Sequence, residues 1–452
     1  MKPRLFACAS IAACLSIGGS SAGRLHAGAA RSVLPSSASA KTLLSTTTRH
    51  REWVTVGSGS TSTPAFVVYP ERADRAPVVL VTGRGESADV QSRAIGDQLA
   101  AEGFISITTE ATGAAAHDAA RAYAIHLPAA DGRSAWLDVD FTQHHVQIAT
   151  AHSGVGHFTL STDEWPRVVE YISHATGNTF AASAQDTHGA TASRMIPGLA
   201  DKAPNLPAGY YSATKTLADS KLKREYVDIP IGDLKLHTWV EYPAGTGKTG
   251  VVIVMQHGVG LDDWMRSIAD QIAADGFIAV APDAWSGTGP NGGNRDSFQF
   301  DDDAMRAAAR INADETQRRY KAARDWALTL PRSNGRTGSI GFCAGGGNSF
   351  RFAGEVPDLN AAVVFYGTPP GEELMKKINA PVLAFYGEND ARVTATAAPT
   401  TESMKRLGKS FEPHIYPKVT HSFVYFQDLS VNREAVADAW PRVVAFYKKN
   451  LR

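Results

Sequence analysis

The stretch Gly338-Ser339-Ile340-Gly341-Phe342-Cys343-Ala344-Gly345-Gly346-Gly347 decides the fold of this chain, because it predicts a strand that turns abruptly into a helix. Gly341, Cys343 and Gly345 have the spacing of the nucleophile elbow G-x-S-x-G, with cysteine in place of serine. Such a turn is crowded and strained, so the residues beside the nucleophile need to lack a Cβ. The N–H groups at the start of the following helix favour a thiolate. The alternative is a glycine-rich turn around a buried structural cysteine, because buried free cysteines are common.

The composition is that of an ordinary globular protein and excludes several kinds of partner. A chain of 452 residues allows two or three domains, and 43% of its residues are hydrophobic. The 45 basic and 45 acidic side chains give a formal net charge of zero. We therefore expect no nucleic-acid-binding surface and no strongly charged partner.

The N-terminus has the layout of a secretory signal peptide, which we assign to residues 1–27. Lys2 and Arg4 precede an apolar core over 5–17 that is too short to span a bilayer, and small residues follow it. We therefore expect export to the periplasm or the medium, with no membrane span after the signal is removed. The alternatives are a lipid anchor at Cys14, whose context resembles a bacterial lipobox, and an uncleaved cytosolic extension.

The cysteine count singles out Cys343 as a reactive candidate. The chain has three cysteines, and the other two, Cys8 and Cys14, lie in the expected signal peptide. Once the signal is removed, Cys343 has no partner for an intramolecular disulfide. Because a free thiol is a liability in an oxidising compartment, its presence suggests that it is needed for chemistry.

An internal duplication organises the chain. Residues 51–111 align without a gap on residues 224–284, and 22 of the 61 pairs are identical. Chance would give roughly one identity in fifteen to twenty, so we infer a repeat of two copies. In the second copy, residues 251–255 and 277–281 predict buried strands around a helix over 264–275. This pattern predicts two parallel strands joined by a right-handed crossover.

The first copy is shorter than the second and lacks the elbow. His152 corresponds to His421 in spacing, but the first copy contains no cysteine and no G-x-S-x-G. We interpret residues 45–178 as a truncated, inactive hydrolase-like domain, with a separate ligand-binding role as the alternative. We expect it to pack tightly on the second copy, because its shortened sheet would otherwise leave an exposed edge. Residues 179–222 are rich in small and polar residues and predict a linker.

Residues 223–452 alternate between predicted strands and helices, which indicates a doubly wound, mostly parallel α/β sheet. Between these elements we expect a polar loop over 286–303 that contacts the substrate, and one helix over 303–330. In doubly wound sheets, ligands bind at the carboxyl ends of the strands. Three residues that carry chemistry each follow a predicted strand there, namely Cys343, Asp390 and His421. Their order, nucleophile then acid then histidine, is that of the α/β-hydrolases.

Residues 224–452 resemble the dienelactone hydrolase family of α/β-hydrolases. The resemblance rests on Gly341-Phe342-Cys343-Ala344-Gly345-Gly346, Tyr386-Gly387-Glu388-Asn389-Asp390 and Thr420-His421-Ser422-Phe423. It implies a Cys-His-Asp triad that acts on esters or lactones. Two positions depart from the family pattern. His257 stands where a glutamate usually helps to activate the thiol, and Tyr425 stands where an arginine helps to hold the substrate carboxylate.

The expected function is hydrolysis of a small-molecule ester or lactone through a thioacyl intermediate on Cys343. His421 would take the thiol proton and Asp390 would hold its tautomer, while the N–H groups of Gly258 and Ala344 would form the oxyanion hole. His257 either replaces the family glutamate as a proton partner or shapes the pocket. We expect no cofactor, and no spaced set of histidines and cysteines predicts a metal site. The alternative function is an exported, non-catalytic binding protein that retains the hydrolase shell.

Overall fold

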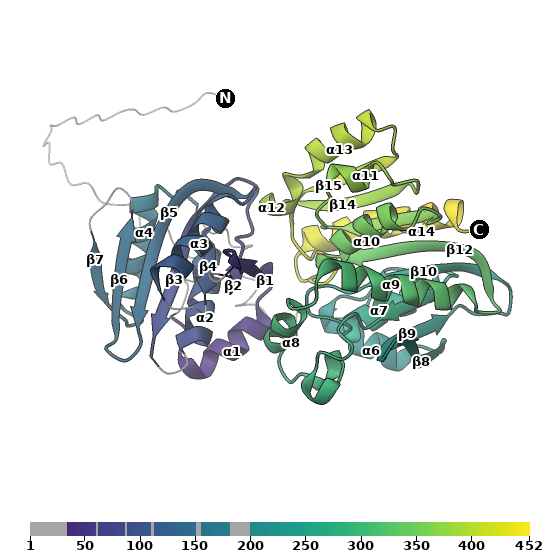
Figure 1. Ribbon diagram of the computed structural model, residues 1–452, viewed down its shortest axis with the longest axis horizontal. Helices are drawn as coiled ribbons and strands as arrows, with labels where there is room; N and C mark the ends of the chain where they lie inside the picture. Colours follow the sequence, from purple (N-terminus) through teal and green to yellow (C-terminus); the bar gives the residue numbers. More distant parts are fainter. Residues whose placement is uncertain (1–33, 60–61, 86–87, 110–112, 151–154, 181–198) are drawn as a thin grey trace, which may run out of the picture.

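The computed structural model describes residues 34–59, 62–85, 88–109, 113–150, 155–180 and 199–452, and the structural statements below refer to these residues. The expected signal peptide and His152 lie outside them. Two sheets build two domains that lie side by side along the long axis of the molecule (Figure 1).

The N-terminal domain is built on a seven-stranded mixed sheet. Its strands are β1 (Arg51–Val56), β2 (Thr63–Val68), β3 (Ala76–Arg84), β4 (Ile105–Thr109), β5 (Ala130–Asp140), β6 (His145–Thr150) and β7 (Gly156–Thr159). Its helices are α1 (Ser37–Thr46), α2 (Ala88–Ala101), α3 (Ala114–Ile125) and α4 (Trp165–Thr176). The strand order is β1-β2-β4-β3-β5-β6-β7. β3 pairs in parallel with β4 and β5, and the remaining pairs are antiparallel.

The C-terminal domain is built on an eight-stranded sheet. Its strands are β8 (Lys223–Ile231), β9 (Leu234–Tyr242), β10 (Thr249–Met255), β11 (Ile278–Pro282), β12 (Ser333–Phe342), β13 (Ala361–Phe365), β14 (Val382–Asn389) and β15 (Phe411–Thr420). Its helices are α6 (Ala213–Asp219), α7 (Asp263–Ala274), α8 (Asp301–Ala308), α9 (Ala313–Leu328), α10 (Ala344–Glu355), α11 (Glu372–Met375), α12 (Ala391–Thr394), α13 (Ala397–Arg406) and α14 (Ser430–Asn450).

The order of this second sheet is β15-β14-β13-β12-β10-β11-β9-β8. The six strands from β10 to β15 are parallel, and the hairpin of β8 and β9 joins β11 in antiparallel fashion. The expected doubly wound, mostly parallel sheet is therefore confirmed. All parallel strands end at the same edge of the sheet, which places the residues that follow them together.

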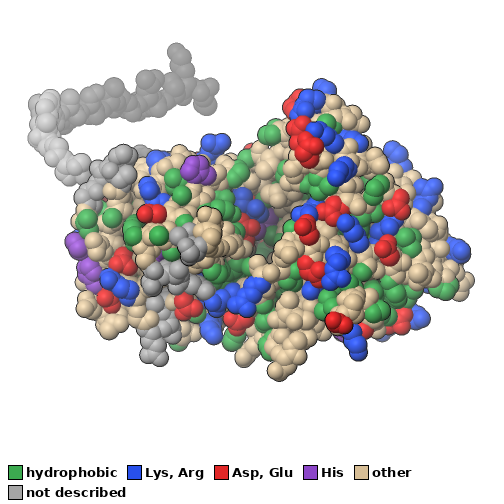
Figure 2. Space-filling view, in the orientation of Figure 1, with side chains coloured by type: hydrophobic (Ala, Val, Ile, Leu, Met, Phe, Trp, Pro, Cys, Tyr) green, Lys and Arg blue, Asp and Glu red, His purple; other side chains and the backbone are tan. Residues whose placement is uncertain are grey.

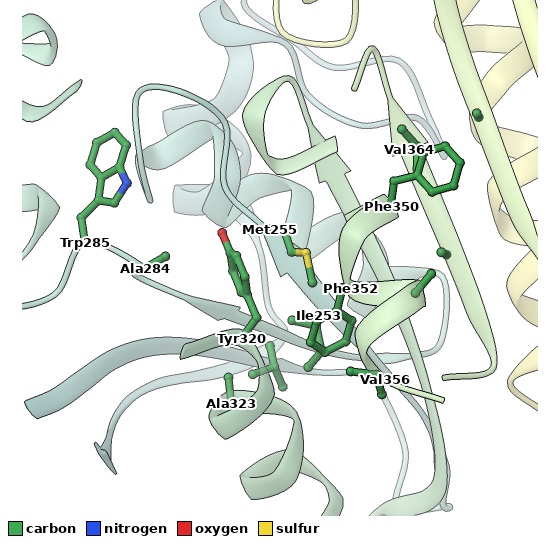
Figure 3. Close-up of a cluster of buried hydrophobic side chains, with 14 of the residues drawn as sticks. Ile253, Met255, Ala284, Trp285, Tyr320, Ala323, Phe350, Phe352, Val356 and Val364 are labelled. Carbon is green, nitrogen blue, oxygen red and sulfur yellow. The ribbon is translucent and has the colours of Figure 1, made fainter. Parts of the chain in front are cut away.

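Alternation along β10 sends side chains into two separate cores. Ile253 and Met255 pack with Tyr320 of α9 in one cluster of buried residues, which Figure 3 shows. Val254 faces the other way and packs with Trp264 of α7 in a second cluster. Because both faces are covered by helices, the strand is apolar throughout rather than alternating with polar residues. Each fully buried aliphatic or aromatic side chain contributes about 1.5–3 kcal/mol.

The first five strands of the two sheets follow the same spatial order. β1-β2-β4-β3-β5 in the N-terminal sheet matches β8-β9-β11-β10-β12 in the C-terminal sheet. An internal duplication would give this agreement, and the duplication itself stays a prediction from the sequence. Beyond the fifth strand the two domains differ, because β6 runs antiparallel to β5 whereas β15 runs parallel to β14.

The strand register also shows what stands in the N-terminal domain at the place of the elbow. Met255 pairs with Gly341 in the C-terminal sheet, and Thr82 pairs with Asp138 in the N-terminal sheet. The position of Cys343 therefore corresponds to Asp140, whose carboxylate accepts hydrogen bonds from the N–H groups of Thr142 and Gln143. A hairpin turn replaces the elbow.

The expected single helix over 303–330 is wrong, because the structure has two helices there. α8 ends at Ala308 and α9 begins at Ala313. The Asn312 side chain accepts a hydrogen bond from the Glu315 N–H at 2.8 Å and caps α9. A capping asparagine competes with a continuous helix, which explains the break. The expected polar loop over 286–303 is correspondingly shorter, since α8 already begins at Asp301.

The second half of the expected linker belongs structurally to the C-terminal domain. Within it, a short 3-10 turn (Tyr210–Ser212) precedes α6. The Trp264 indole donates a hydrogen bond to the Ala208 carbonyl at 2.9 Å. The Tyr210 N–H donates one to the Tyr425 carbonyl at 2.7 Å. Because these groups are tied to the C-terminal core, a domain boundary at Lys223 falls too late.

The two domains are in close contact, as expected. One cluster of buried side chains contains Leu44, Trp53 and Phe66 from the first domain together with the core of the second. The buried ion pair of Arg93 and Asp302 crosses the interface at 2.9 Å. The contact includes α1, α2, β1 and the segment after β2, where the Ala391 N–H of α12 donates a hydrogen bond to the Arg72 carbonyl at 3.1 Å. The edge that follows β5 is extended by β6 and β7.

Among the described residues, no helix has both the length and the apolar character that crossing a membrane requires.

We expect substitution of Trp53 to destabilise the interface between the domains more than substitution of an exposed residue. It is 9% exposed, and the guanidinium groups of Arg93 and Arg306 lie 5.0 and 5.6 Å from its ring. Trp53→Ala should lower the free energy of unfolding by about 3 kcal/mol, because it removes a buried aromatic ring and two cation–π contacts. Urea unfolding followed by circular dichroism measures this loss. As a control, Ile415→Ala on β15, where the side chain is 49% exposed, should change the free energy by less than about 0.5 kcal/mol. Equal losses for both variants would contradict the prediction.

Candidate active site

The elbow has the geometry that its glycines predict. Cys343 lies between β12 and α10 with φ 57° and ψ −117°, which is a strained conformation for a residue with a side chain. A Cβ on Gly341 would come within 1.8 Å of the Gly345 carbonyl oxygen. A Cβ on Gly345 would come within 2.2 Å of the Met255 carbonyl oxygen. Neither position accepts a larger residue, so these glycines allow the sharp turn that presents the thiol.

The structure brings together the three residues that the sequence predicts as a triad. Cys343 follows β12, Asp390 follows β14, and His421 follows β15. His421 Nδ1 and Asp390 Oδ2 are 2.5 Å apart, and both side chains are buried. Since Nδ1 is engaged by the carboxylate, the other ring nitrogen of His421 is free to serve the thiol, which lies within 4.8 Å of it.

A second histidine, which the sequence analysis missed, also contacts the thiol. His50 Nδ1 lies 3.5 Å from Cys343 Sγ, and the His50 ring centroid lies 4.3 Å from that of His421. His50 belongs to the N-terminal domain and immediately precedes β1. In the sequence, His50 stands out only because it precedes Arg51, where the repeat begins. This position does not predict contact with Cys343, which lies 293 residues further along the chain.

These three side chains form a compact group of potential ligands. Cys343 Sγ and one ring nitrogen of each histidine lie within 4.8 Å of one another, so the group could hold a metal ion. The sequence analysis found no spaced set because the three residues come from three distant segments of the chain.

Behind the two histidines lie two carboxylates. Asp390 supports His421, and Glu52 Oε2 lies 3.8 Å from His50 Nε2. Glu52 Oε1 accepts a hydrogen bond from the Tyr69 hydroxyl at 2.7 Å and lies 3.9 Å from the Arg392 guanidinium. Burial alone would raise the pKa of Glu52, but Arg392 and His50 hold it well below its usual value. Glu52 is therefore ionised at the domain interface.

The charges around Cys343 favour a thiolate. Burial raises the pKa of the thiol, but the two histidines, His50 and His421, bring its pKa well below the usual value. Burial lowers the pKa of His421, yet the charges of Asp390 and Cys343 raise that pKa to about 9. Burial alone would raise the pKa of Asp390, but the neighbouring His421 lowers it by more, so the pKa of Asp390 is below its usual value. At neutral pH the site thus holds a thiolate and an imidazolium.

Strained backbone conformations gather around the site. Cys343, Tyr366 and Ser422 have positive φ angles of 57°, 39° and 57°. Tyr366 follows β13 and its ring lies 4.8 Å from that of His421, while Ser422 is the next residue after His421. Non-glycine residues in this region cost about 1–3 kcal/mol each and cluster at functional sites. Their concentration at the carboxyl ends of β12, β13 and β15, at one edge of the sheet, supports a functional role for this edge.

Two adjoining cavities of about 240 and 340 Å³ open beside Cys343. Gly258 lines both cavities, and Ala344, the first residue of α10, lines the larger one. Both residues expected to supply the oxyanion hole therefore border the space beside the thiol. The smaller cavity is also lined by Ser45 to Arg51 of the N-terminal domain, and Figure 2 shows the molecular surface hollowed between the two domains.

His257 lies in the cavity wall and contacts groups other than the thiol. Its Nε2 is 3.2 Å from Asp262 Oδ2, and its ring packs 4.9 Å from Trp264 and 5.0 Å from Tyr425. These contacts favour the pocket-shaping role over the role of proton partner, which His50 is better placed to fill. Tyr425 is 7% exposed and lines the smaller cavity, so it contributes shape where the family pattern has an arginine.

Comparison with known proteins assigns the C-terminal domain. Residues 236–451 match the profile of the dienelactone hydrolase family. A relative from Saccharolobus solfataricus, named as a proposed carboxymethylenebutenolidase, is 29% identical over 228 residues, or 44% of this chain and 88% of the relative. Protein usf of Aquifex pyrophilus is 29% identical over 245 residues, or 50% of this chain and 99% of that protein.

Solved structures of dienelactone hydrolases match over about half of the chain, 51–52%. The crystal structure of a dienelactone hydrolase from Anabaena variabilis covers 52% of this chain and 100% of its own, with a TM-score of 0.42 and 20% identity. The N-terminal domain lies outside the residues that match the family profile. Residues 236–451 thus match the dienelactone hydrolase family, and the chain is a hydrolase.

Proposed function

We propose that the chain hydrolyses carboxylic esters or lactones through a thioacyl intermediate on Cys343. One observation carries the proposal. The buried pair of Asp390 and His421 lies at the strand ends within reach of a thiol that sits at a strained elbow. The lactone class is also supported by the name carboxymethylenebutenolidase, which several relatives bear.

In the acylation step, the Cys343 thiolate attacks the carbonyl carbon and forms the C–S bond. The carbonyl oxygen becomes an oxyanion, which the N–H groups of Ala344 and Gly258 stabilise. One such donor is typically worth about 3 kcal/mol in the transition state. The C–O bond to the alcohol then breaks, and the leaving alkoxide takes its proton from the His421 imidazolium.

In the deacylation step, neutral His421 accepts a proton from water as the water attacks the thioester carbonyl. The C–S bond breaks, the carboxylic acid product leaves, and Cys343 returns to the thiolate beside protonated His421. Asp390 holds the imidazole in the tautomer that this exchange requires. No cofactor enters either step.

A non-catalytic binding protein is the second candidate, because the cavities beside Cys343 would also hold a ligand without turnover. The strained elbow and the raised pKa of His421 favour the enzyme, since a binding pocket needs neither.

Cys343→Ala should abolish hydrolysis of a simple aryl ester, because it removes the nucleophile. Cys343→Ser should retain only a small residual rate, since the serine hydroxyl is not ionised at neutral pH. His421→Ala should cost several orders of magnitude, as expected for groups that act as a unit. The measurement is ester turnover by the full chain, with binding of the same ester measured in parallel. Full turnover by Cys343→Ala would rule out the thioacyl route, and binding without turnover by the unsubstituted chain would favour the binding protein.

The raised pKa of His421 predicts that the pH dependence of kcat/KM differs between esters with different leaving groups. Below pH about 9 His421 is protonated and can donate to an alkoxide, and above it this donor is lost. The kcat/KM for an ethyl ester should therefore fall as the pH rises through about 9. The kcat/KM for a 4-nitrophenyl ester should fall far less, because 4-nitrophenolate leaves without a proton. Superimposable alkaline limbs for the two esters would show that His421 is not the proton donor.

We further propose that the chain is exported and that the signal peptide is removed. The mature protein should then begin after residue 22 to 30 and carry one free thiol, Cys343. Intact-mass analysis of the periplasmic or secreted protein, with and without alkylation, measures both features. A lipid-modified N-terminal Cys14 would support the anchored alternative instead.

A further inference from the structure

The feature that the proposed triad leaves unused is His50. Its side chain is buried, and its position is fixed at the backbone because the Tyr69 N–H donates a hydrogen bond to the His50 carbonyl at 2.9 Å. The Tyr69 ring also lies 5.2 Å from the His50 ring. The hairpin of β1 and β2 therefore holds the imidazole rigidly against Cys343.

Each nitrogen of the His50 ring faces a group that accepts hydrogen bonds. Nδ1 faces Cys343 Sγ at 3.5 Å, and Nε2 faces the Glu52 carboxylate at 3.8 Å. His421 has the same arrangement, with Cys343 on one side and Asp390 on the other. Two carboxylate–imidazole pairs therefore meet at one sulfur atom. The pair of Glu52 and His50 comes from the N-terminal domain, and the pair of Asp390 and His421 comes from the C-terminal domain.

We propose that His50 is a second histidine partner of the Cys343 thiolate, so that the active site is complete only when the N-terminal domain is docked. This inference rests on the proposed thioacyl route. It assigns to the N-terminal domain a direct part in the chemistry, which neither the family profile nor the sequence repeat assigns.

The charges of the cluster support this assignment. The thiolate, Asp390 and Glu52 contribute three negative charges, and His421 and Arg392 contribute two positive charges. The cluster therefore carries an excess of negative charge. A hydrogen-bond donor at the sulfur is favourable there, because an unpaired buried charge is expensive, and His50 Nδ1 lies 3.5 Å from the sulfur.

The chemical role follows from the step in which negative charge returns to the sulfur. During thioester hydrolysis His421 takes the proton of water as the water attacks, and negative charge develops on sulfur when the C–S bond then breaks. His50 Nδ1–H then donates a hydrogen bond to the departing thiolate and gives up no proton, so atoms and charges balance as in the deacylation step above. A hydrogen bond to an ionised group is about twice as strong as a neutral one.

The test is the reactivity of Cys343 toward iodoacetamide as a function of pH, measured on the full chain. His50→Ala should move the midpoint of alkylation upward by about one pH unit or more, because it removes a hydrogen-bond donor 3.5 Å from the sulfur, and a hydrogen bond to the charged form of a group lowers its pKa. His50→Gln should give a smaller shift of the same sign, since the amide can still donate a hydrogen bond. His157→Gln, on the exposed strand β7 at the far edge of the sheet, is the matched control and should leave the midpoint unchanged.

Hydrolysis by the same variants separates the two proposals. His50→Ala should lower kcat for the aryl ester by about 10–100-fold while thermal unfolding stays close to that of the unsubstituted chain. An unchanged alkylation midpoint in His50→Ala, with Cys343→Ala inactive, would overturn the role of His50 and leave the thioacyl route standing. Turnover by Cys343→Ala would overturn the route itself.

Zinc binding offers a measurement that does not depend on catalysis. Three donor atoms within 4.8 Å, each imidazole supported by a carboxylate, match the ligand types and outer partners that Zn²⁺ prefers. Zn²⁺ should bind competitively with a chromophoric chelator and slow alkylation, and His50→Gln and His421→Gln should each weaken binding by about 10-fold or more. Equal zinc affinity in His50→Gln and His157→Gln would contradict the placement of His50, even where activity is lost through misfolding.

Discussion

The thiolate of Cys343 is the constraint on which the rest of the structure depends. A negative sulfur in a partly buried site requires compensating positive charge, because burial alone would keep the thiol protonated. The glycine-lined elbow of β12 and α10 presents the sulfur, the ends of β14 and β15 bring Asp390 and His421 to it, and the start of β1 brings His50. Strands of both domains therefore place side chains around the negative charge on the Cys343 sulfur.

The elbow and the convergence of Cys343, Asp390 and His421 were predictable because local rules determine them. The G-x-C-x-G spacing indicates the turn, and the rule that parallel strands end at one edge brings residues 343, 390 and 421 together without knowledge of the packing. His50 was not predictable in this way. It reaches the sulfur only because two domains dock, and docking depends on side chains such as Trp53 and Arg93 whose sequence context looks like that of any buried strand or helix.

The errors in the fold share one physical cause, which is that a single side chain can redirect the backbone. Asn312 ends one helical segment and caps the next, so a periodic pattern over 303–330 gives two helices. The sequence left two roles open for His257, proton partner and pocket wall. Asp262 lies beside its Nε2 and Trp264 packs on its ring, which favours the pocket wall. Neither the Asn312 cap nor the Asp262 contact is visible in hydrophobic periodicity.

The N-terminal domain lies over the edge of the C-terminal sheet at which Cys343 lies. In the sheet of the N-terminal domain, Asp140 and a hairpin turn occupy the place that corresponds to Cys343. Its β1 side instead closes over the carboxyl ends of the C-terminal strands and leaves cavities of about 240 and 340 Å³. Partial burial by the N-terminal domain strengthens the charge interactions around the sulfur. Docking of the domain thereby couples thiolate stability and the supply of His50 in a single interface.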